Sequence, residues 1–249
     1  MTMTATRVED IAPVDRAEAS SLAVEEFRRA RAFLASLTDD DWHRPTDCPA
    51  WDVRALVGHV LGGGEAFASV RELVHQMRAA TAGQKRGEVF IDVMTALQVE
   101  ERSTLTREEL LTRLEAVGPK AARFRRRFAF RRMSMKEEIG GQPETWRMAY
   151  LVDRVLNRDT WMHRVDLARA TDRPMELTAD HDGRIVADAV ADWADRHGQP
   201  FTLHLEGVAG GEFVQGDDGE ELTLDAVDFC RILSERAPGE GLLAQPVPF

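Results

Sequence analysis

Apolar residues recur at helical spacing through the N-terminal two thirds of the chain. Positions mostly three or four apart put their side chains on one face of an α-helix. In residues 14–37 these positions are Leu22, Phe27, Ala30, Phe33, Leu34 and Leu37. The same periodicity predicts further helices over residues 51–81, 105–128 and 144–170. Four long amphipathic helices with one long connection predict a four-helix bundle, a fold whose core often holds a metal.

Breaks in the pattern predict the helix ends. Thr106 is followed three residues later by Glu109, which is the spacing of a capping box and predicts a helix start. Gly83 and Gly87 end the second predicted helix, and Pro174 ends the fourth. Residues 131–141 finish with two glycines and have no clear periodicity.

The pattern changes after Pro174. Residues 181–196 predict a helix, residues 201–206 alternate as in a strand, and residues 212–215 predict a return strand. Residues 224–236 are again helical in pattern. The chain therefore divides into a helical domain, residues 1–172, and a small α+β domain, residues 173–249. The predicted fold class is α+β.

Composition limits the kinds of partner. At 249 residues, with 43% hydrophobic side chains, the chain can bury a sizeable core. A net charge of −11 argues against nucleic acid or an anionic membrane surface as the main partner. Only two cysteines are present, residues 1–13 lack the plan of a signal peptide, and no apolar run approaches the ~18 residues of a membrane span. We expect a soluble cytoplasmic protein.

Three residues have the spacing of a metal site. Asp159 and His163 are four apart, so a helix puts them on one face. If His59 comes from a facing helix, the three form a set with an open fourth position, as a catalytic divalent metal requires. The run of three glycines at 62–64 is costly inside a helix, at roughly 1 kcal/mol each, and indicates close approach of a ligand or of another helix, or a local break. A histidine packed in the core is the plainer interpretation of His59 alone.

Two segments carry a family resemblance. Residues 45–59, which include Pro49-Ala50-Trp51-Asp52, and residues 158–171 resemble the mycothiol-dependent maleylpyruvate isomerase family, within the DinB-like superfamily of metal-binding four-helix bundles. Residues 228–236 and 241–249 are similar to the family's second domain. The resemblance implies a DinB-like bundle followed by a small α+β domain similar in shape to sterol carrier proteins.

The resemblance also implies a cofactor and a cosubstrate. Family members hold a divalent metal, usually zinc, at positions that match His59, Asp159 and His163, and they use mycothiol as the thiol. Relatives commonly have Glu at the acidic position. Asp159 is one methylene shorter, so either the helix lies closer to the metal or the coordination differs.

The implied chemistry is attack by a thiolate. A free thiol has a pKa of about 8.5, and coordination to a dication holds it as thiolate at neutral pH. In the family, this metal-bound thiolate attacks a small electrophilic substrate. The expected enzyme is therefore a metal-dependent, mycothiol-using isomerase or S-transferase. Its partners are the low-molecular-weight thiol and the electrophile, with no oligomer required.

Three arginines are candidates for substrate or cofactor contacts. Arg54, on the helix of His59, could reach a carboxylate and is the candidate for cofactor binding. The family is thought to use an arginine of the second domain, for which Arg231 and Arg236 are the catalytic candidates. Asp166, one turn after His163, is placed either to orient a ligand or to bond within the helix.

Two other functions remain open. The chain could be a non-catalytic protein of the same fold that binds a metal and a small ligand. It could also be a metal-dependent hydrolase, in which water of lowered pKa takes the open position. Retention of a ligand without turnover would indicate the first, and activity without added thiol the second.

Overall fold

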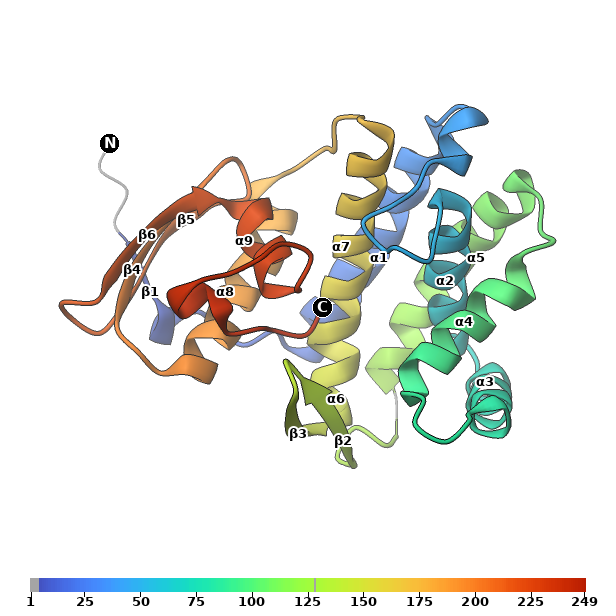
Figure 1. Cartoon of the computed structure of the whole chain (residues 1–249), viewed down its shortest axis with the longest axis horizontal. Coiled ribbons are helices and arrows are strands. Elements are labelled where there is room, and N and C mark those ends of the chain that lie inside the picture. The colour runs from blue at the N-terminus through green and yellow to red at the C-terminus, as the bar shows by residue number, and fades with distance from the viewer. Residues whose placement is uncertain (1–4, 128) are drawn as a thin grey trace. The chain divides into compact units, whose positions relative to one another are not determined.

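The computed structural model describes residues 5–127 and 129–249, and its chain falls into two compact units. We call Arg16–Ala129 with His163–Met175 the helical unit. We call Met1–Asp15, Phe130–Met162 and Glu176–Phe249 the sheet unit. Helix α7, Leu156–Thr171, is one uninterrupted helix that contributes turns to both (Figure 1). The predicted domains, with a boundary at residues 172–173, stay a prediction.

The helical unit is built on one apolar core. Its helices are α1 (Arg16–Ala35), α2 (Val53–Ala66), α3 (Val70–Gly83), α4 (Phe90–Arg102), α5 (Arg107–Arg127) and the C-terminal turns of α7. The short 3-10 helix η2, Asp40–His43, follows α1. Leu34 of α1, Leu56 of α2, Leu114 of α5 and Leu167 of α7 are all buried in the same cluster. Four predicted helical stretches thus contribute to this core.

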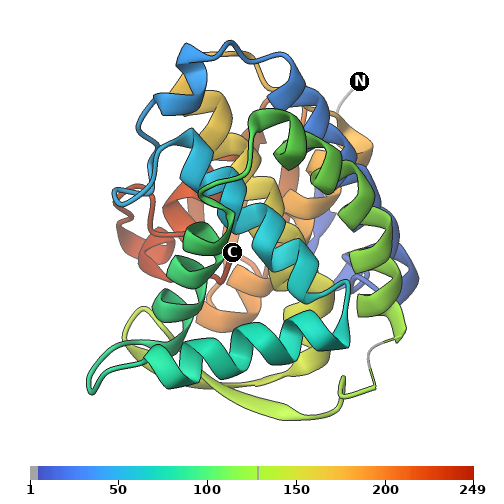
Figure 2. The same cartoon turned by 90° about the vertical axis from the view of Figure 1, so that its right-hand side faces the viewer.

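The long helix predicted over residues 51–81 is wrong, because the chain turns between α2 and α3 (Figure 2). Ser69 begins α3, and its hydroxyl accepts from the Glu72 amide at 3.5 Å. Helix α4 was not predicted. Its buried side chains are the polar Gln98 and Arg102, while Ile91 is exposed, so its apolar pattern does not report its buried face.

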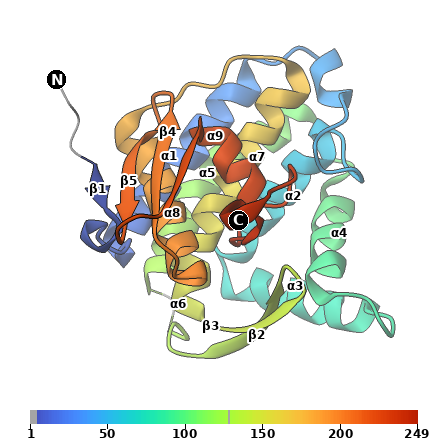
Figure 3. The same ribbon diagram turned by 60° about the vertical axis from the view of Figure 1, so that its left-hand side comes forward.

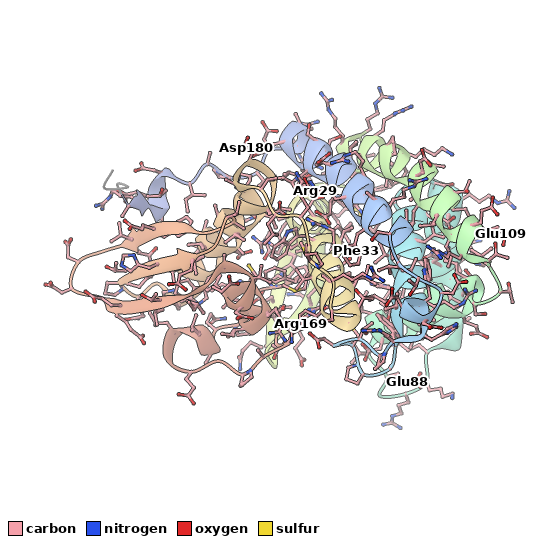
Figure 4. The ribbon with its side chains drawn as sticks, turned by 90° about the horizontal axis from the view of Figure 1, so that it is seen from above. Arg29, Phe33, Glu88, Glu109, Arg169 and Asp180 are labelled. Carbon is pink, nitrogen blue, oxygen red and sulfur yellow. The ribbon has the colours of Figure 1, made fainter. Side chains whose placement is uncertain are left out.

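The start of α5 confirms the predicted capping box. The Thr106 amide donates to Glu109 Oε2 at 2.7 Å, and the Glu109 amide donates to Thr106 Oγ1 at 3.2 Å. Figure 4 shows Glu109 at this end of the helix. The predicted end of the helix, Phe128, lies outside the described residues.

A β-hairpin replaces the start of the fourth predicted helix. Strands β2 (Ser134–Ile139) and β3 (Gln142–Arg147) pair antiparallel, with Gly140 and Gly141 in the turn at φ +55° and +74°. The expectation of helix from residue 144 is therefore wrong. The helical backbone begins with α6 (Met148–Tyr150), passes through the π-helix η3 (Leu151–Val155) and continues as α7.

The sheet unit contains a four-stranded sheet in the order β1-β5-β4-β6 (Figure 3). Strands β4 (Phe201–Glu206) and β5 (Gly211–Gln215) are antiparallel and occupy the predicted positions. Strands β1 (Thr6–Arg7) and β6 (Glu220–Asp225) were not predicted. The main helices here are α8 (Arg184–His197) and α9 (Ala226–Leu233), and the short ones are η1 (Val8–Asp10), η4 (Ala179–Gly183) and η5 (Gly241–Ala244). The predicted α+β class is confirmed.

A buried ion cluster joins α7 and α8 within the sheet unit. Arg158 is 1% exposed and donates to Asp188 Oδ2 at 2.8 Å and to Asp192 Oδ2 at 2.7 Å. Tyr150 donates to the same Asp192 oxygen at 2.5 Å. Since the arginine meets two carboxylates, its burial is electrostatically compensated.

In the described part of the chain, every helix is too short or too polar to cross a lipid bilayer.

Candidate metal centre

The loop before helix α2, residues 46–51, is closed by backbone hydrogen bonds. The Thr46 amide donates to the Trp51 carbonyl at 3.2 Å, and the Trp51 amide donates to the Cys48 carbonyl at 2.9 Å. Asp52 then caps the helix, because its carboxylate accepts from the Ala55 amide at 2.8 Å. These local bonds set the direction in which α2 leaves the loop and thereby where His59, two turns later, points.

His59 and His163 meet inside the helical unit. Their ring centroids are 5.0 Å apart and the rings are nearly perpendicular, at 86°. The residues are 8% and 5% exposed. Trp51 is half-buried and stacks on His59, with the two ring centroids 4.9 Å apart. The tryptophan therefore covers one face of the imidazole and limits its movement.

Asp159 precedes His163 by one turn of α7, so the helix itself sets their relative position. His59, Asp159 and His163 each offer one ligand atom, and these atoms lie within 4.8 Å of one another. The three predicted ligands are thus brought together. The site contains two neutral nitrogen donors and one carboxylate, a set that suits zinc and leaves a position for a further ligand. The residues present therefore fit a divalent metal.

Both histidines have a partner on the ring nitrogen Nδ1. His163 Nδ1 lies 3.0 Å from Asp166 Oδ2, and His59 Nδ1 lies 2.8 Å from Gln98 Oε1. Since an oxygen acceptor at Nδ1 holds the proton there, the lone pair of each ring is on Nε2, the atom that can ligate a metal. Asp166 is fully buried, and its contact with His163 is a bond within α7 that also orients the imidazole.

Helix α7 is anchored beside His163 by a buried ion pair. Arg164 Nε lies 2.5 Å from Glu26 Oε1, and Arg164 Nη2 lies 3.0 Å from Glu26 Oε2 of α1. Both side chains are almost completely buried. Near the end of α7, Arg169, labelled in Figure 4, donates to Asp47 Oδ2 at 2.8 Å. These contacts hold the His163 turn against α1 and the loop before α2.

Cys48 lies beside the same turn of α7. Its Sγ is 3.8 Å from Asp166 Oδ2, and the thiol, His163 and Asp166 form a second group with ligand atoms within 4.8 Å of one another. The cysteine is half-buried. Asp166 already bonds His163, so the contact with Cys48 places the thiol at the edge of the His163–Asp166 pair.

The predicted arginines have structural partners. Arg54 donates from Nη2 to the carbonyls of Ser103, at 3.1 Å, and Leu105, which ties α2 to the loop before α5. In the sheet unit, Arg231 Nη1 donates to Asp228 Oδ1 at 3.2 Å. The Arg236 amide donates to the Arg231 carbonyl at 2.9 Å. A role for Arg54 in cofactor binding, and for Arg231 or Arg236 in catalysis, stays a prediction.

Sequence reasoning missed Gln98, the amide partner of His59, and Gln76, which bonds Gln98. Gln98 and Gln76 are buried on α4 and α3, and polar residues within helices give no periodic signal for burial. The glycine run was the available signal. A Cβ built on Gly62 would lie 2.6 Å from Gln98 Cβ, so this glycine is what allows α4 to approach α2. Of the explanations offered for the run, the close approach of another helix is the one present at Gly62.

The chain is similar to known proteins over most of its length. The family model described as Mycothiol maleylpyruvate isomerase N-terminal domain matches residues 23–168, which include all three candidate ligands. A solved structure titled as the mycothiol-dependent maleylpyruvate isomerase aligns with a TM-score of 0.55 and 17% identity, over 93% of this chain and 92% of that one. A histidine-to-alanine mutant bearing the same title gives 0.54 and 16%, with the same coverage. At this identity the likeness shows a shared fold. No curated protein matches the chain.

Proposed function

Because the chain belongs to the mycothiol maleylpyruvate isomerase family, we propose that it is a mycothiol-using isomerase with a divalent metal held by His59, Asp159 and His163. The observation that carries the proposal is the convergence of these three side chains from two helices. The solved neighbours supply the reaction, since their titles name a mycothiol-dependent isomerase.

The charges of the ligand set favour an anionic thiol. Two neutral imidazoles and one carboxylate carry a total charge of −1, so a dication at this site would keep a net positive charge. A bound divalent metal supplies the electrostatic attraction that lowers the pKa of a thiol toward neutrality. The chain's own residues hold the donors in place: Asp166 orients His163, and Trp51 packs on His59.

The substrate follows from the chemistry of the thiolate. An isomerase of this kind acts on a conjugated double bond to a carbonyl group. The thiolate sulfur adds to one carbon of the carbon–carbon double bond. That bond becomes a single bond, about which the molecule can rotate. The sulfur then leaves with its electron pair and the double bond forms again. The thiol is regenerated, so the substrate and the product have the same composition. If the thioether instead accumulates as product, the enzyme is an S-transferase.

Metal content tests the site first. We expect about one zinc per chain after zinc loading and exhaustive dialysis, measured by elemental analysis, and loss of that zinc in His59→Ala. His43→Ala, which removes an exposed histidine, is the matched control and should keep the zinc. Equal zinc content in the two variants would contradict the assignment of His59.

Turnover tests the reaction. We expect mycothiol-dependent cis–trans isomerisation of a conjugated keto acid, followed by ultraviolet absorbance. His163→Ala should lower the rate at least a hundredfold, while His43→Ala should retain it. Thiol-dependent turnover that survives in His163→Ala would contradict the mechanism, and hydrolytic cleavage of the substrate without added thiol would indicate a hydrolase.

A further inference from the structure

A chain of buried amides runs from His59 through three helices of the helical unit. His59 Nδ1 lies 2.8 Å from Gln98 Oε1 of α4, and Gln98 Nε2 lies 2.8 Å from Gln76 Oε1 of α3. Gln76 Nε2 lies 3.0 Å from the Gly62 carbonyl and 2.9 Å from Glu72 Oε1. Gln76 is fully buried and Gln98 is 4% exposed, so these bonds are sheltered from water.

The last two acceptors give the chain a direction. The Gly62 carbonyl and the Glu72 carboxylate can only accept, so the end of Gln76 that faces them must be its NH₂ group. Burial acts to raise the pKa of Glu72, but the hydrogen bond from Gln76 and the charge of Arg102 outweigh it, and the pKa is lowered. Glu72 is therefore ionised at neutral pH.

Each bond then determines the next. Because Gln76 directs its NH₂ group to Glu72, its Oε1 faces Gln98. Gln98 therefore donates to Gln76 Oε1 from its own NH₂ group. Gln98 consequently turns Oε1 toward His59. A buried oxygen facing Nδ1 requires the proton to be on that nitrogen, since two facing acceptors without a proton would leave both unsatisfied. The reverse orientation would put Gln76 Oε1 against two oxygen acceptors.

The surroundings are built around these amides. Arg102 is 4% exposed and donates to the Gln98 carbonyl at 3.1 Å, to Glu65 Oε2 at 2.7 Å and to Glu72 Oε1 at 3.1 Å. It thereby connects α4 to α2 and α3. Gly62 admits the Gln98 side chain at a distance that no Cβ would permit.

We propose that Gln98 and Gln76 are positioning residues, which transmit the acceptor character of Glu72 to His59 and keep the ring in the tautomer with the proton on Nδ1. The lone pair is then on Nε2, ready to ligate. The consequence for metal binding rests on the site proposed above, whereas the tautomer is a property of the protein without metal. Second-sphere partners of this kind typically change metal affinity 10–100-fold.

Gln76→Met tests the relay without touching His59. Methionine fills the same volume but gives Gln98 no acceptor, so Gln98 can turn over. In the metal-free protein, we expect ¹⁵N NMR of the histidine rings to show the His59 proton on Nδ1 in the wild type and a mixture in Gln76→Met. The zinc Kd, measured by competition with a chromogenic chelator, should rise about tenfold. Gln84→Met, at the exposed C-terminal cap of the same helix, should change neither quantity.

A second substitution separates orientation from simple packing. In Gln98→Glu both carboxylate oxygens are acceptors, so the side chain can accept a hydrogen bond from His59 Nδ1 in either orientation. We therefore expect Gln76→Met combined with Gln98→Glu to restore the Nδ1 proton, with folding followed by circular dichroism. A merely structural role for Gln76 predicts no such rescue.

The outcomes distinguish the two proposals. A wild-type His59 with its proton on Nε2 would overturn the relay, and so would an unchanged tautomer in Gln76→Met. If the wild type holds its proton on Nδ1 but retains no zinc, the metal site fails while the relay stands.

Discussion

At the scale of single residues, neighbouring glycines of α2 have unequal surroundings. A Cβ on Gly62 would lie 2.6 Å from Gln98 Cβ and 2.8 Å from Gln98 Cγ, whereas a Cβ on Gly63 would have no heavy atom within 4 Å beyond its own neighbours. Both residues lie in the interior of the same helix, so backbone propensity favours alanine equally at the two positions. Only packing distinguishes them.

Gly62→Ala and Gly63→Ala should therefore change stability in opposite directions. Gly63→Ala should stabilise the protein by about 0.5–1 kcal/mol, the ordinary gain of alanine over glycine in a helix. Gly62→Ala should destabilise it by about 1–3 kcal/mol, because Gln98 must move. Urea unfolding followed by circular dichroism measures both. Shifts of the midpoint in the same direction would show that Gln98 does not pack on α2 as described.

At the scale of secondary-structure elements, one buried ion pair holds α7 to α1. Glu26 and Arg164 are 0% and 2% exposed, and each is the other's bidentate partner. Arg164 follows His163 directly, so the pair also determines where the histidine is held. By contrast, Arg28 and Glu25 form an exposed pair on α1 at 2.7 Å, which is expected to contribute little to stability.

Arg164→Met should cost about 3–5 kcal/mol of unfolding free energy, because the buried carboxylate of Glu26 would lose the cation that binds both of its oxygens. Arg28→Met should change the same quantity by no more than about 1 kcal/mol. Urea titrations of both variants make the comparison. In Glu26→Gln combined with Arg164→Met the buried charge is absent, so part of the stability should return. Equal losses of unfolding free energy in Arg164→Met and Arg28→Met would contradict this account of α7.

At the scale of the whole molecule, each unit contains a carboxyl group of low pKa. Hydrogen bonds from Thr38 lower the pKa of Asp41 to about 2 in the helical unit. In the sheet unit, burial opposes ionisation of Asp192, but the charges of Arg158 and Arg154 prevail and lower its pKa to about 2. The ordinary pKa of an aspartate carboxyl group is 3.8. Both units should therefore lose stability in the same range of pH.

The sign follows from proton binding. The folded pKa lies below the unfolded one, so the stabilisation is fully present above about pH 4 and is lost as the pH falls toward 2. For Asp192 the shift corresponds to on the order of 2 kcal/mol. Asp192→Asn should therefore be less stable than wild type at pH 7, and the gap should narrow below pH 4. Urea midpoints measured from pH 7 to pH 2 test this, and a gap independent of pH would contradict it.

The sequence by itself determined the features that depend on local spacing. Helical periodicity located α1 and α5, the interval from Thr106 to Glu109 predicted a capping box, and the step from Asp159 to His163 put both on one face. Such features follow from backbone geometry, which repeats along the chain and can be read without knowing any partner.

Only the tertiary structure decided the features that depend on distant partners. Strand β6 exists because Leu222 pairs beside Leu203, and the buried face of α4 is polar because Gln98 and Arg102 find partners on other helices. The meeting of His59 with His163 also required α2 and α7 to pack on a common core. A polar side chain is stable in the interior only when a partner satisfies its hydrogen bonds, and the residues next to it in the sequence do not identify that partner.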